Sequence, residues 1–127
     1  MKRRGDGNER LFVYGSLAPR KRNFHQLKRL RGSWERAQVN ARLLVIHSGL
    51  DARYLGLQDG KKTVQGHLFV SRHLPDHWKA LERFEGVHYE RGTITVCSKQ
   101  SVCEACVFFI KPNRVKTAWL GRRALSP

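Results

Sequence analysis

Residues 11–17 read Leu11-Phe12-Val13-Tyr14-Gly15-Ser16-Leu17. Four apolar or aromatic residues that end at a glycine are typical of a buried strand running into a tight loop. The glycine allows close approach to the backbone, and successive N–H groups leaving a strand can form an anion-binding concavity. The stretch therefore predicts a strand followed either by an ordinary turn or by a binding loop for a carboxylate or an oxyanion.

The rest of the 127-residue chain predicts one mixed domain of strands and short helices, spanning 1–127. Apolar alternation or apolar runs predict strands at 39–46, 64–70, 92–97 and 102–110. Three-residue spacing predicts a short helix at 23–30, and 49–60 is expected to be a loop in which Tyr54-Leu55 is a candidate for brief strand pairing. Residues 1–9 and about 113–127 are expected to be loose basic tails.

A second helix is expected at 74–84, with Pro75 in its first turn and Gly86 as its stop signal. Its apolar stripe consists of Leu74, Trp78, Leu81 and Phe84. On a helical wheel Glu85 lies near the centre of this stripe, whereas Glu82 lies toward its edge. A carboxyl in such a place can have a raised pKa suited to proton transfer near neutral pH. The alternative is that Glu85 lies past the helix end and meets solvent or an arginine.

Further motifs follow in a defined order. Asn23 and His25 come after the opening loop, and Val64-Gln-Gly-His-Leu-Phe-Val70 has the form Val-x-Gly-x-Leu-Tyr-x. Leu81-Glu-Arg-Phe-Glu-Gly86 is close to Leu-Asp-x-x-Glu-Gly, and Tyr89-Glu-Arg91 has the form Tyr-x-Arg. From Leu11 to about Ile110 this order resembles the gamma-glutamylcyclotransferase-like family, of the gamma-glutamylamine cyclotransferase type.

The resemblance implies an α+β fold with a small mixed barrel-like sheet, two or three short helices and a cavity for a gamma-glutamyl group. In that family the substrate's own α-amine attacks its γ-carbonyl, which releases 5-oxoproline and a free amine or amino acid. This intramolecular attack needs no cofactor and no nucleophilic side chain. The implied small-molecule substrate is a gamma-glutamyl amino acid, a gamma-glutamylamine or a glutathione-like peptide.

The same resemblance assigns roles to residues of this chain. Glu85 would move the proton from the α-ammonium to the leaving nitrogen, and the backbone N–H groups of Gly15, Ser16 and Leu17 would hold the glutamyl carboxylate or the oxyanion. Tyr14 and Tyr89 would line the pocket, although Tyr89 also fits ordinary strand packing. Arg91 is interpreted as structural.

Two departures from the family pattern are visible. A proline that often precedes the central strand is absent from 51–55, and the late strand has Phe108 and Phe109 where the family often has a tyrosine. Because the tyrosine would supply a hydroxyl, its loss leaves the substrate open.

The chain carries a formal charge of +15, with basic clusters at 2–4, 20–22, 28–31, 61–62 and 122–123. Such a field attracts polyanions without regard to sequence. The alternative function is therefore a non-catalytic basic binding module on the same fold, for nucleic acid or another polyanion. A basic surface also serves solubility or an acidic substrate, and no aromatic-rich basic ribbon or recognition helix is apparent.

Metal, export and membrane functions are not expected. Cys103 and Cys106 have zinc-like spacing without a second pair, and His73 and His77 lack the glutamate of a zinc-protease motif. An odd number of cysteines, three in all, argues against a disulfide framework and favours a reducing cytoplasm. No apolar run approaches the roughly 20 residues of a membrane span. The leaving amine and the oligomeric state stay open.

Overall fold

The computed structural model describes residues 7–15, 24–48, 52–86 and 88–111. Its strands are β1 (Arg10–Val13), β2 (Ser33–Ser48), β3 (Ala52–Val70), β4 (Tyr89–Ser98) and β5 (Val102–Ile110). Its helices are α1 (His25–Lys28) and α2 (Trp78–Glu85), with the 3-10 turns η1 (Gly7–Glu9) and η2 (Leu74–Asp76). The predicted α+β fold with few short helices is confirmed.

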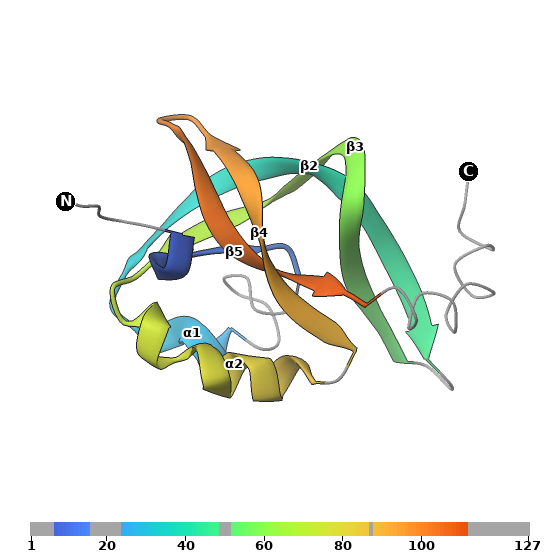
Figure 1. Ribbon diagram of the computed structural model, residues 1–127, viewed down its shortest axis with the longest axis horizontal. Coiled ribbons are helices and arrows are strands. Elements are labelled where there is room, and N and C mark those ends of the chain that lie inside the picture. The colour runs from blue at the N-terminus through green and yellow to red at the C-terminus, as the bar shows by residue number, and fades with distance from the viewer. Residues whose placement is uncertain (1–6, 16–23, 49–51, 87, 112–127) are drawn as a thin grey trace.

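The strands form a closed barrel in the order β1-β3-β2-β4-β5. β5 returns to β1 in parallel, with Leu11 opposite Cys106, whereas the other neighbouring strands pair antiparallel. The sheet is therefore mixed, as expected. Both α-helices lie on one side of the barrel (Figure 1).

Strand alternation divides the apolar residues between two cores. The inner core, inside the barrel, consists of Phe12, Ala37, Val39, Ala41, Leu57, Val64, Leu68, Val96, Ala105 and Val107. The outer core lies under the helices and consists of Leu11, Val13, Leu27, Phe69, Leu74, Trp78, Leu81, Cys106 and Phe108. Consecutive residues such as Leu11 and Phe12 thus serve opposite faces of the same strand.

Strand pairing at Tyr54-Leu55 is confirmed, but the expectation of a loop is wrong for the rest of 52–60, which also belongs to β3. These residues pair with the second half of β2, and Leu57 is fully buried. The turn signal Asp59-Gly60 marks an irregularity of the ladder, because Ala41 pairs with Lys62 but Arg42 pairs with Gln58. Cross-strand pairing and burial therefore override a local preference for a turn.

The single helix expected at 74–84 is divided into η2 and α2. Pro75 lies in η2, and Gly86 ends α2 as predicted. Without Leu74 in the same helix, the buried face of α2 is set by Trp78 and Leu81, so Phe84 falls to its edge at about 60° beyond Leu81. Phe84 is accordingly 37% exposed and is not a member of the buried stripe.

The expectation of a loose tail is wrong for residues 7–9, which form η1. The carbonyl of Asn8 accepts a hydrogen bond from the indole N–H of Trp78 at 3.1 Å, and the carbonyl of Glu9 accepts one from the backbone N–H of Ser71 at 2.8 Å. These bonds attach the start of the barrel to α2 and to the segment before η2. Residues 1–6 and 112–127 lie outside the described part of the chain.

Candidate active site

Tyr14 follows β1 and lies where three strands meet. Its ring stacks on Phe12 of the inner core, with 6.4 Å between the ring centroids. Its hydroxyl donates a 2.6 Å hydrogen bond to the carbonyl of Phe108 in β5, and the backbone of Leu57 in β3 also bonds to it. The Tyr14 hydroxyl therefore ties the end of β1 to β3 and β5.

Glu85 is the last residue of α2, on the same face as Trp78 and Leu81. The next residue, Gly86, has a φ of +83°, which L side chains rarely adopt, and its N–H bonds to the carbonyl of Glu82 at 3.0 Å. The Glu85 side chain is partly buried, and this burial raises the pKa of its carboxyl to about 7. At neutral pH the carboxyl is thus divided between its acid and base forms.

Electrostatic coupling places Tyr14, Tyr89 and Glu85 in one neighbourhood. The pKa of Tyr14 is raised well above its usual value, first by burial, then by the charges of Tyr89 and Glu85, against a smaller opposing effect of the Leu57 backbone. Nearby charges have this effect on a buried group. The fold therefore brings together the end of β1, the end of α2 and the start of β4.

Tyr89 has a structural role that the sequence left open. It begins β4 and packs against the outer core, and its hydroxyl donates a 2.6 Å hydrogen bond to the carbonyl of Leu55 in β3. Tyr89 therefore both packs as an ordinary strand residue and lies beside Tyr14. Its hydroxyl fixes the ring, so the ring face is what it can offer a ligand.

Arg91 connects β4 to α2 through Glu82. Within the described ranges, Glu85 forms no ion pair with an arginine. The Arg91 guanidinium lies 4.5 Å from the centroid of the Trp78 ring, and its Nε lies 3.2 Å from a carboxylate oxygen of Glu82. The arginine therefore meets the carboxylate at the edge of α2. This contact fits the structural interpretation of Arg91.

Two glycines of the expected motifs have distinct surroundings. A Cβ built on Gly66 would lie 2.5 Å from the carbonyl oxygen of Val13, so this glycine is required for the close approach of β1 and β3. A Cβ built on Gly15 would meet no described atom within 4 Å, so no residue of the described ranges crowds this backbone. Ser16 and Leu17, the other expected members of the binding loop, lie outside the described residues, as does Asn23.

Three backbone groups of the site were not predicted from the sequence. The carbonyls of Leu55 and Phe108 and the backbone of Leu57 hold the two tyrosine hydroxyls. Leu55 and Leu57 fall in the stretch expected to be a loop, although their spacing of two is a weak strand signal. At Phe108 the late strand supplies a backbone acceptor.

The described residues include no cluster of three or more His, Cys, Asp or Glu able to hold a metal ion. Cys103 and Cys106 lie on opposite faces of β5, against the inner and outer cores respectively, and neither forms a disulfide within the described residues. In the ranges that the structure covers, no helix is both long and apolar enough to cross a membrane.

Comparisons with known proteins agree with this architecture. The family model described as gamma-glutamyl cyclotransferase, AIG2-like, matches residues 11–123. The solved structures that are similar include YkqA from Bacillus subtilis, with a TM-score of 0.64, 20% identity, and coverage of 81% of this chain and 36% of that one. No curated protein matches the chain.

Two further structures carry names related to the family. An AIG2-like protein from Mus musculus has a TM-score of 0.61 and 16% identity, with 83% of this chain and 80% of that one covered. A structure titled gamma-glutamyl cyclotransferase has a TM-score of 0.59 and 11% identity, covering 80% of this chain and 66% of that one. At such low identities these likenesses establish the fold.

Proposed function

The chain belongs to the AIG2-like gamma-glutamyl cyclotransferase family, and from this premise we propose that it converts a gamma-glutamyl compound into 5-oxoproline and a free amine or amino acid. The observation that carries the proposal is the partly buried carboxyl of Glu85. This carboxyl lies beside Tyr14 and Tyr89 and has a pKa of about 7. Perturbed carboxyls of this kind are a feature of proton-transfer sites.

The reaction is an internal acyl transfer. Starting from the α-ammonium, the attacking nitrogen forms a bond to the γ-carbonyl carbon, and the bond from that carbon to the leaving nitrogen breaks. Two protons pass from the first nitrogen to the second, so that the product amine leaves as an ammonium. No water, oxidant or reductant is consumed. Because both reacting groups belong to one molecule, the enzyme has to fold the substrate and move the protons.

The raised pKa suits Glu85 to this transfer. An α-ammonium has an ordinary pKa of about 8, and a carboxylate at its usual pKa of about 4.3 is a much weaker base. A carboxyl with a pKa of about 7 accepts the proton at little cost and returns it readily to the leaving nitrogen. In this proposal Glu85 is first the general base and then the general acid.

The loop after β1 would bind the glutamyl end of the substrate. Because no described residue crowds the Gly15 backbone, the substrate could approach it closely. The N–H groups of Gly15, Ser16 and Leu17 would then donate to the α-carboxylate or the oxyanion. Tyr14 and Tyr89 would form the wall through their rings, since both hydroxyls already bond to backbone carbonyls. The class of leaving amine is left to experiment.

The test is to incubate the full chain with gamma-glutamyl amino acids, gamma-glutamylamines and glutathione-like peptides, and to measure 5-oxoproline and the released amine. We expect at least one compound to give both products in equal amounts. The matched control is the same compound with its α-amine acetylated, which should be inert because it cannot cyclise. Absence of turnover across the panel, or cleavage of the acetylated control, would overturn the proposal.

A further inference from the structure

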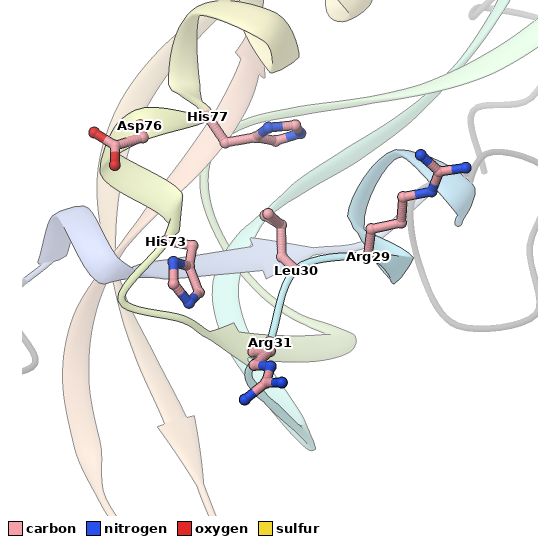
Figure 2. A pocket seen from close by; sticks show the side chains of 6 residues that line it. All are labelled: Arg29, Leu30, Arg31, His73, Asp76 and His77. Atoms are coloured by element: carbon pink, nitrogen blue, oxygen red, sulfur yellow. The ribbon is translucent and has the colours of Figure 1, made fainter.

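A cleft of about 370 Å³ lies between the end of α1 and η2, away from the Glu85 neighbourhood. We refer to it as the α1–η2 cleft, and its lining residues are Arg29, Leu30, Arg31, His73, Asp76 and His77 (Figure 2). His77 precedes α2 and Glu85 ends it, so the two residues are about 12 Å apart along the helix axis. The cleft is thus separate from the candidate active site.

One buried side chain fixes the two walls of this cleft relative to each other. The hydroxyl of Ser71, which is 2% exposed, donates a 2.5 Å hydrogen bond to the carbonyl of Arg31 and accepts one of 3.1 Å from the N–H of His73. Gly32 adds a close approach, because a Cβ there would lie 2.2 Å from the carbonyl oxygen of Val70. These contacts hold the wall formed by residues 29–31, the arginine wall, against the wall formed by residues 73–77, the histidine wall.

A second tie closes the other end. Nε2 of His77 lies 3.1 Å from the carbonyl oxygen of Gln26 in α1. A carbonyl oxygen only accepts, so Nε2 carries the proton and donates it. In Figure 2 the His77 ring accordingly extends toward the α1 side of the cleft. With both ends tied, the cleft exists before any ligand arrives, which lowers the entropic cost of binding.

The lining is basic and has an apolar centre. Arg29 and Arg31 are exposed and, among the described residues, form no ion pair, while the half-buried Leu30 lies between the two walls. The single carboxylate of the lining, Asp76, points away from Leu30 in Figure 2. A guanidinium presents a fork of N–H donors that matches phosphate oxygens. The guanidiniums of Arg29 and Arg31 lie at opposite ends of the cleft in Figure 2, so they suit an anion that carries more than one phosphate group.

We infer that the α1–η2 cleft binds a phosphate-bearing anion, with Arg29 and Arg31 on the phosphate oxygens and the histidine wall beside them. The phosphate belongs either to a free oligophosphate or to a nucleic-acid backbone. This site does not depend on the proposed cyclotransferase reaction.

The experiment must separate a built site from the general attraction of a +15 protein. The full chain is titrated at physiological salt with inorganic tripolyphosphate and, separately, with a short fluorescent single-stranded RNA. The double variant Arg29→Gln/Arg31→Gln is compared with Arg36→Gln/Arg42→Gln, which removes the same charge from exposed positions on β2 outside the cleft. We expect at least a tenfold loss of affinity for the first pair and less than threefold for the second.

The outcomes divide cleanly. Tripolyphosphate binding with cleft selectivity supports the site and identifies a free phosphate, whereas selective RNA binding alone identifies a nucleic-acid backbone. Equal losses for the two double variants, or no binding of either probe, would overturn the inference. Production of 5-oxoproline should be the same in both double variants.

A change of opposite sign gives an independent check. Asp76→Asn removes the negative charge of the lining and should strengthen binding of the same probe by about two- to threefold. Unchanged or weakened binding in this variant would contradict a charge-based site. The thermal unfolding midpoint of each variant shows whether the fold is retained.

Discussion

The two carboxylates of α2 lie three residues apart, yet their surroundings differ. Glu82 has a side chain that is 44% exposed and pairs with Arg91 of β4. Glu85 is partly buried beside Tyr14, and burial raises the pKa of its carboxyl to about 7. One turn of helix therefore carries both a solvated structural charge and a group suited to proton transfer, and their position relative to Trp78 and Leu81 decides which is which.

The strongest test of this difference is catalytic. Glu85→Gln keeps the size of the side chain but removes the proton-transfer group, so kcat for 5-oxoproline release should fall by about 10²–10⁴-fold. Glu82→Gln is the matched control and should stay within about threefold of the parent protein. Full activity in Glu85→Gln, or an equal loss in both variants, would erase the distinction between the two carboxylates.

A second test concerns stability as a function of pH. Because the pKa of Glu85 rises from 4.5 to about 7 on folding, the folded state holds a proton that the unfolded chain has released between these values. Stability should therefore fall as the pH rises from 4.5 to about 7 and should level off above it. At about 1.4 kcal/mol per pKa unit, reduced for partial exposure, the loss is about 2–3 kcal/mol.

Urea unfolding at several pH values between 4 and 8 measures this loss. The decline should be absent from Glu85→Gln and present in Glu82→Gln, after each curve is referred to its own value at pH 4. A Glu85→Gln curve that parallels the parent protein would show that the buried carboxyl does not gain a proton on folding.

The tyrosines beside Glu85 provide a smaller effect. Tyr14→Phe removes one hydrogen bond to the Phe108 carbonyl and a second from the Leu57 backbone, so unfolding free energy should fall by about 2 kcal/mol. Tyr89→Phe removes the bond to the Leu55 carbonyl and should cost about 1 kcal/mol. Chemical denaturation measures both, and a larger cost for Tyr89→Phe would contradict the central place of Tyr14.

Much of the fold was predictable because its signals are local. The apolar runs at 64–70 and 102–110 fall within strands, and Gly86 ends α2 where expected. Apart from Tyr54-Leu55, residues 52–60 were missed because their strand state depends on pairing with β2, across a bulge that looks like a turn in the sequence. Such pairing is a tertiary effect that local propensity does not encode.

The geometry of the candidate site was predictable in part for the same reason. Helical spacing alone put Glu85 on the buried face of α2, since the wheel depends only on chain geometry. The sequence did not show that the hydroxyls of Tyr14 and Tyr89 donate hydrogen bonds to the carbonyls of Phe108 and Leu55. Every residue has a backbone carbonyl, so no sequence pattern marks the acceptors. The α1–η2 cleft was also missed, since the hydrogen bonds of Ser71 and His77 that hold its two walls together join residues far apart in the sequence.

The smallest expected effect concerns the contact that distinguishes Glu82. The pair of Arg91 and Glu82 is substantially exposed, so a double-mutant cycle with Arg91→Ala and Glu82→Ala should give a coupling of about 0.5 kcal/mol that weakens in high salt. The stacking of Arg91 on Trp78 lies outside this coupling, since it survives in Glu82→Ala.

Arg91→Lys therefore separates the two contacts: it keeps the charge but loses the planar guanidinium. If the stack holds α2 in place, Arg91→Lys should reduce kcat for 5-oxoproline release more than Glu82→Gln does, with the pH profile set by Glu85 unchanged in shape. The reverse order would mean that the ion pair, and not the ring contact, orients the helix end that carries Glu85.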